Sequence, residues 1–167
     1  MKAHVLLHVR ELPGGPAVVT PVQFAHLSTE AATVAGAVAA LRPKLVDALR
    51  EIEPVDRLPY ASVPVAKLLR IPVSVPRPGK DADTLDIAVG VVMMERVARG
   101  QTYLVAYVPM VRRVRASTRR DGDVDRVLAR LTKSVAKNLK SWSTEYVLNT
   151  DEPEDSRLEI VEIDLES

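Results

Sequence analysis

Residues 124–139 read VDRVLARLTKSVAKNL and residues 34–49 read VAGAVAALRPKLVDAL, and both stretches carry apolar residues at the same spacing. The intervals are four, three, four and four, which place the apolar residues on one face of an α-helix. The two sets are Val34, Val38, Leu41, Leu45, Leu49 and Val124, Leu128, Leu131, Val135, Leu139. Each member of the second set follows its counterpart by 90 residues (124 − 34), so the sequence predicts two copies of one structural unit.

The same offset continues into a segment that alternates like a β-strand. Leu68, Ile71, Val73 and Val75 correspond to Leu158, Val161, Ile163 and Leu165, again 90 residues later (158 − 68). Before each helix, alternating apolar segments separated by turn residues predict three further strands. They span residues 4–12, 17–24 and 26–28 in the first half, and 85–94, 102–108 and 111–116 in the second.

We therefore predict an α+β fold of two tandem β-β-β-α-β units, each a small, mostly antiparallel sheet with one helix packed on it. The expected boundaries are residues 1–76 for the first unit, 77–83 for a linker and 84–167 for the second. Units of this size are close to the lower limit for independent stability, so we expect the two to pack as one globule. Ser28 or Thr29 is expected to cap the first helix, and Pro43 to kink or divide it.

Composition excludes several classes of protein. The chain has no cysteine, which rules out disulfides, thiolate metal sites and cysteine nucleophiles. The apolar run at the N-terminus is too short for a signal peptide, and no stretch approaches the ~18 apolar residues of a membrane span. We expect a soluble, cytoplasmic protein that does not enter a membrane.

No group of residues matches a known catalytic or metal-binding pattern. His4 and His8 are four apart on a predicted strand, which separates them by ~13 Å along the chain. The run Asp121–Asp125 begins like a calcium loop, but Thr132 occupies the place of the final glutamate ligand. We therefore predict no catalytic residues, no cofactor and no metal. An enzyme with an unfamiliar site remains a third alternative, which a pocket joining His26 or Tyr107 to carboxylates would favour.

Charge is strongly divided in the second half. Residues 96–140 carry twelve basic and three acidic side chains (12 − 3 = +9), whereas residues 141–167 carry one basic and nine acidic ones (1 − 9 = −8). The basic residues form the candidate partner-binding face: Arg112, Arg113, Arg115, Arg119, Arg120, Arg126, Arg130, Lys133 and Lys137. Such a face suits a protein partner or a phosphate backbone. Trp142 is the only aromatic residue near this basic segment that we expect to support stacked bases. We therefore rank nucleic acid below protein as the expected partner.

Two resemblances follow from this layout. The hairpin returning as Val18-Val19-Thr20-Pro21-Val22-Gln23-Phe24, followed by a capped amphipathic helix, resembles the partial RNase-H-like unit of HicB-type antitoxins. The tandem arrangement as a whole, which ends just after the strand expected at 157–166, resembles the N-terminal region of Clp-type AAA+ ATPases. The second resemblance implies a non-catalytic adaptor that recruits substrates or partners. The alternative is a HicB-like antitoxin or nucleic-acid-binding protein that uses the basic face.

Overall fold

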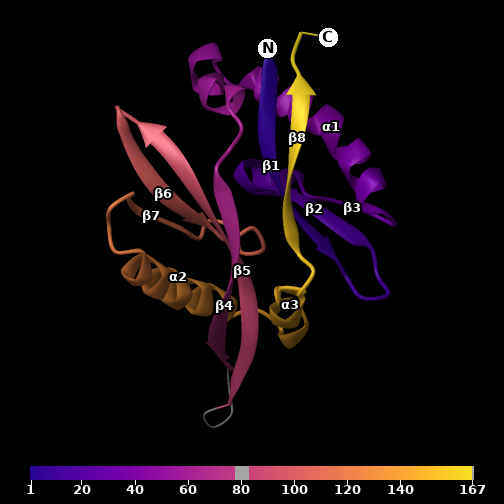
Figure 1. Cartoon of the computed structure of the whole chain (residues 1–167). Coiled ribbons are helices and arrows are strands. Elements are labelled where there is room, and N and C mark those ends of the chain that lie inside the picture. Colours follow the sequence, from indigo (N-terminus) through magenta and orange to yellow (C-terminus); the bar gives the residue numbers. More distant parts are fainter. Residues whose placement is uncertain (78–82, 167) are drawn as a thin grey trace. The chain divides into compact units, whose positions relative to one another are not determined.

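The computed structural model describes residues 1–77 and 83–166, which form two compact units. Unit 1 comprises Met1–Val65 together with Pro153–Ser167, and unit 2 comprises Ala66–Glu152. Each unit has a four-stranded antiparallel sheet covered on one face by a helix, which confirms the predicted α+β class (Figure 1).

The sheet of unit 1 has the strand order β3-β2-β1-β8. Helix α1 packs on it, and two 3-10 segments, η1 and η2, flank the helix in sequence. The elements are β1 (Lys2–Glu11), β2 (Ala17–Pro21), η1 (Val22–Leu27), β3 (Thr29–Ala31), α1 (Val34–Glu51), η2 (Pro54–Ala61) and β8 (Arg157–Asp164).

The sheet of unit 2 has the strand order β4-β5-β6-β7. Helix α2 packs on one face of it, and the short helix α3 contributes Val147 to the same core. The elements are β4 (Ala66–Pro76), β5 (Thr84–Ala98), β6 (Gln101–Tyr107), β7 (Arg115–Arg119), α2 (Val124–Leu139) and α3 (Thr144–Asn149).

The closing strands are exchanged between the two halves of the sequence. β4 follows α1 along the chain but pairs with β5 of unit 2, and β8 follows α2 but pairs with β1 of unit 1 (Figure 1). The expected boundaries at residues 76 and 84 are therefore wrong. The segment 77–83, expected to be a linker between units, stands in sequence between β4 and β5, which pair with each other. Its residues 78–82 lie outside the described part of the chain.

The helix registers agree with the offset of 90. α1 and α2 begin 90 residues apart, and their N-caps, Thr33 and Asp123, are separated by the same number (123 − 33). The buried positions also correspond: Ala37, Leu41, Leu45, Leu49 in α1 and Val127, Leu131, Val135, Leu139 in α2. The first two members of each predicted stripe are only partly buried: Val34 and Val38 in α1, and Val124 and Leu128 in α2. In this part of each helix the buried residue is Ala37 or Val127, one position before the predicted Val38 or Leu128.

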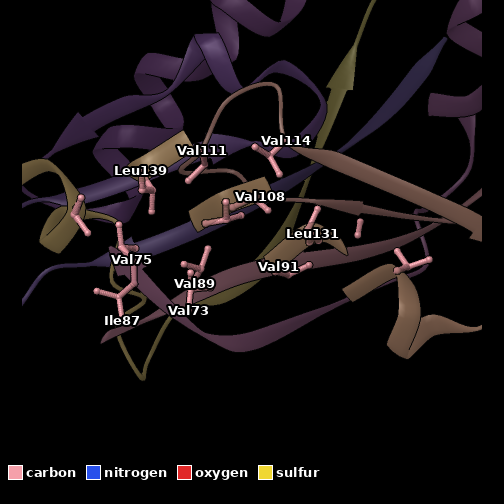
Figure 2. Close-up of a cluster of buried hydrophobic side chains, with 14 of the residues drawn as sticks. Val73, Val75, Ile87, Val89, Val91, Val108, Val111, Val114, Leu131 and Leu139 are labelled. Carbon is pink, nitrogen blue, oxygen red and sulfur yellow. The ribbon is translucent and has the colours of Figure 1, made fainter. Parts of the chain in front are cut away.

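Each sheet supplies the opposite side of its core through alternate residues. In unit 1 these are Ala3, Val5, Leu7 and Val9 of β1, and in unit 2 they are Ile87, Val89, Val91 and Met93 of β5. Figure 2 shows how Val73, Val89 and Val91 lie among the other buried side chains of the unit 2 core. Aliphatic residues therefore fill both cores, with Phe24 and Tyr60 stacked at the side of the first.

Several local expectations are corrected. Residues 22–27 form η1 in place of a continued strand, and the third strand of unit 2 begins at Arg115, after a turn in which Arg113 has a φ of 66°. Thr33, and not Ser28 or Thr29, caps α1 by accepting the Gly36 N–H at 3.1 Å. Pro43 does not divide α1; it lies on the exposed face, where water can satisfy the carbonyl that proline leaves without a helical partner.

Candidate functional site

An open hollow of about 770 Å³ lies beside β7, the edge strand of the unit 2 sheet. We call it the β7 hollow. Its lining residues are Arg96, Ala98, Tyr103, Val105, Tyr107, Arg115, Ala116, Ser117, Arg130, Leu131 and Ser134. They come from three neighbouring strands and from α2, so residues far apart in sequence meet at one place.

The strand register places the polar side chains opposite one another. Arg96 of β5 is paired with Tyr103 of β6, and Tyr107 is paired with Arg115 of β7. Because side chains alternate along a strand, these four residues share the face of the sheet that points away from α2. The Arg96 Nη1 also donates a hydrogen bond to the Tyr107 hydroxyl at 3.3 Å.

The hollow follows the edge of β7 from this face toward α2. Arg115 and Ser117 point to the face that carries the tyrosines, whereas Ala116 between them points to the other. Arg130 and Ser134 reach the hollow from the helix. The main-chain edge of β7 therefore lies between two groups of cationic and hydroxyl side chains.

The chemistry of the lining favours anions. Three guanidinium groups and four hydroxyl groups are present, and the lining contains no Asp or Glu. Arginine offers a rigid fork of donors that matches a carboxylate or phosphate, and hydroxyls can complete the hydrogen bonding. Tyr107 thus lies beside arginines in this hollow. A pocket that joins Tyr107 to carboxylates, which would favour an enzyme, is not what the lining of the hollow provides.

The residues of the predicted basic face are only partly brought together. Arg115 and Arg130 line the β7 hollow. Arg119 and Arg120 line a second, smaller hollow with Gln101, Thr102 and Asp121, and Arg120 lies 3.6 Å from the Glu95 carboxylate. The remaining members are exposed elsewhere: Arg112 and Arg113 in the turn before β7, and Arg126, Lys133 and Lys137 along α2.

Sequence reasoning did not identify Arg96, Tyr103, Ser117 and Ser134 as site residues, and it considered Tyr107 only for an enzyme pocket. Alternation in β6 placed both tyrosines on one face, but only the pairing with β5 and β7 brings them beside arginines. Trp142, the aromatic residue considered for stacking, instead packs against the unit 2 core and makes an edge contact with Tyr146, with ring centroids 6.4 Å apart.

The histidines are spread over different environments. His4 lies 3.7 Å from the Glu162 carboxylate, His8 is fully buried, and His26 is exposed in η1. Within residues 1–77 and 83–166, no three His, Asp or Glu side chains are grouped so that they could hold a metal ion.

The clearest electrostatic pairs lie on β1 and β8 in unit 1. Lys2 Nζ lies 2.7 Å from Glu162, and this hydrogen bond raises the pKa of Lys2 and lowers the pKa of Glu162. Arg157 contacts Glu11 at 2.7 Å and Glu159 at 2.8 Å, and these bonds raise its pKa. Part of the acidic C-terminal segment is therefore engaged in strand pairing.

Comparisons of the chain with protein-family models, curated proteins and solved structures find no match. None of the helices in the described part of the chain is both long and apolar enough to span a bilayer. The chemistry of the β7 hollow is therefore the basis for the functional argument.

Proposed function

We propose that this protein is a non-catalytic recruitment module that binds an acidic segment of a protein partner in the β7 hollow. The observation that carries the proposal is the set of three arginines and four hydroxyls in a lining free of carboxylates. Carboxylates of a partner would replace water around these groups and form charge-assisted hydrogen bonds.

The partial exposure of the site sets the kind of binding expected. Arg115 and Arg130 are exposed and Arg96 is half-buried, so each ion pair is screened by solvent and contributes modestly. Several such pairs acting together would favour rapid, salt-sensitive association. These properties suit an adaptor that binds and releases its partners.

The resemblance to the N-terminal region of Clp-type AAA+ ATPases gives this activity a cellular role. We propose that the module works in the cytoplasm and delivers substrates or partners to such an ATPase. Mixing the purified chain with a purified Clp-type ATPase and an acidic client would test this role directly. The role predicts faster turnover of the client when the module is added, and an unchanged rate would contradict it.

A second candidate, binding of single-stranded nucleic acid, is favoured by one observation. Tyr103 and Tyr107 share a sheet face with Arg96, Arg115 and Arg119, which supplies aromatic rings beside cations. Bases can stack on such rings while arginines contact the phosphates. The basic face would then serve a HicB-like antitoxin or RNA-binding role.

One titration distinguishes the two candidates. Fluorescence anisotropy would compare a glutamate-rich peptide with a single-stranded RNA and a duplex DNA, each at about 50 and 200 mM salt. The recruitment proposal predicts that the peptide binds and that Arg115→Ser and Arg130→Ser each weaken it by about three- to tenfold. Lys137→Ser, on α2 but outside the hollow, is the matched control and should change little. Binding of RNA alone would support the second candidate and overturn the first.

A further inference from the structure

We infer that the partner of the β7 hollow binds as an extended strand, which adds to the open edge of β7 and carries acidic side chains at alternate positions. This inference rests on the proposed recruitment function and specifies how the partner is held. It follows from the direction of the main-chain groups of β7 and from the charges on either side of them.

The register of β7 determines which main-chain groups point outward. The Arg120 N–H donates to the Thr102 carbonyl at 3.1 Å, so the even-numbered residues at this end of β7 face β6. Because the main-chain groups of an antiparallel strand alternate in direction, those of Arg115, Ser117 and Arg119 face away from β6. β7 is the last strand in the order β4-β5-β6-β7, so these groups lie at the edge of the described sheet.

The available edge is short and has a defined end. The Arg119 carbonyl accepts the Gly122 N–H at 2.8 Å, so the chain turns away there. The N–H and carbonyl groups of Arg115 and Ser117 and the N–H of Arg119 remain for an added strand. Five groups suit a short segment of about five residues.

The side chains beside this edge select the sequence of the added strand. A residue directly opposite Arg115, Ser117 or Arg119 would place its side chain on the same face of the sheet as that residue. Acidic residues opposite Arg115 and Arg119, four positions apart in the added strand, would therefore each face an arginine. The residues opposite Ala116 and Thr118 would point to the side of α2, where Arg130 and Ser134 line the hollow.

Short, charged edge strands also prevent a protein from pairing with itself, and β7 has both properties. The same arginines repel a second basic β7 and attract an acidic strand. Recognition of an extended peptide through main-chain bonds, with selectivity from alternate side chains, is a common mode of strand addition.

The first test uses the unmodified protein. The probe is an end-capped peptide with glutamate at alternate positions, compared with a peptide of the same composition in which the glutamates are adjacent. Amide hydrogen exchange measured by NMR should show new protection at Arg115, Ser117 and Arg119 with the alternating peptide. Binding of that peptide without protection of these amides would overturn strand addition.

The second test changes one main-chain donor. Ser117→Pro removes an outward N–H that the pairing with β6 does not use, a position where an edge strand tolerates proline. We expect binding about three- to tenfold weaker, the loss associated with one hydrogen bond. Ser117→Ala keeps the N–H and should bind within about twofold of the original chain.

The outcomes separate this inference from the proposed function. If Ser117→Pro binds normally while Arg115→Ser and Arg130→Ser lose affinity, the acidic partner is retained and strand addition is wrong. If none of the variants changes peptide binding, both proposals fail. Should Ser117→Pro fail to fold, methylating alternate main-chain nitrogens of the peptide tests the same hydrogen bonds, and unchanged binding in both methylation registers would overturn the inference.

Discussion

Gly90 in β5 lies against the side chain of Glu152. A Cβ at position 90 would come within 2.6 Å of the Glu152 carboxyl carbon, and Glu152 is only 1% exposed. The main chain of Glu152 is also held, since its N–H donates to Ala88 at 2.7 Å and its carbonyl accepts from Arg70 at 2.9 Å. The close approach therefore requires glycine at this position.

We predict that Gly90→Ala lowers the free energy of unfolding by about 1–3 kcal/mol, because the buried carboxylate has little room to move. Chemical denaturation would measure the change. In a Glu152→Ala background the same substitution should cost clearly less, as expected for two groups in direct contact. Equal losses in the two backgrounds would show that the carboxylate is not the cause.

Glu162 has a pKa below its ordinary value, mainly because Lys2 donates a hydrogen bond to it. A carboxyl group whose pKa is lowered by folding stabilises the fold above its unfolded pKa, and this contribution is lost as the pH falls through the lowered folded pKa. We predict that Lys2→Met raises the pKa of Glu162 in an NMR titration. The same substitution should remove the part of the loss of stability in acid that comes from protonation of Glu162. Arg157→Met, farther along β8, should leave the Glu162 titration unchanged.

At the scale of elements, α1 and α2 provide a matched comparison of buried and partly buried positions. Leu41 and Leu131 are buried at equivalent positions, whereas Val38 and Leu128 are partly buried. We predict that Leu41→Ala and Leu131→Ala each lower the free energy of unfolding by about 2–5 kcal/mol. Val38→Ala and Leu128→Ala should cost less in the same denaturation experiment. Similar losses at all four positions would show that the helices face the sheets differently.

The helices and their offset could be predicted because the apolar spacing is local and identical in both halves. The opening strands matched less well for a geometric reason. Val5 pairs with Val161 and Val89 pairs with Ile71, so these equivalent residues are 84 apart (89 − 5) and not 90. The second half has six more residues between this strand and its helix, although its first turn is the shorter one: Glu11 pairs with Ala17 across residues 12–16, and Ala98 pairs with Gln101 across Arg99 and Gly100. The additional residues lie in the longer strands β5, β6 and β7 and in the connection from β7 to α2.

The site was less predictable than the helices because it depends on strand pairing. The charge pattern indicated Arg115 and Arg130, but Arg96 and Ser134 join them only through the fold of unit 2. Nothing in the local pattern at β4 or β8 indicates which sheet receives each strand. Both alternate in the same way, so either partner would satisfy their apolar faces.

For the whole molecule, the division of the chain predicts which fragment can fold. Residues 66–152 contain the complete β4-β5-β6-β7 sheet, α2 and the core on which it packs. We predict that this fragment unfolds cooperatively by itself. The fragment 84–167 lacks β4, which exposes the edge of β5, and should be much less stable in the same thermal denaturation measured by circular dichroism. Equal stability of the two fragments would contradict the exchange of strands.

Because of the exchange of closing strands, the sheet of unit 1 can be completed only at the end of synthesis on the ribosome. β1 is synthesised first, but one of its two neighbours, β8, begins 146 residues after β1 ends (157 − 11). At about 5–20 residues per second this interval lasts about 7–30 s. Throughout that time one edge of β1 is open while the whole of unit 2 emerges and can fold. The nascent chain thus carries an exposed strand edge for most of its synthesis, and it is at this stage that mispairing or chaperone binding would be most frequent.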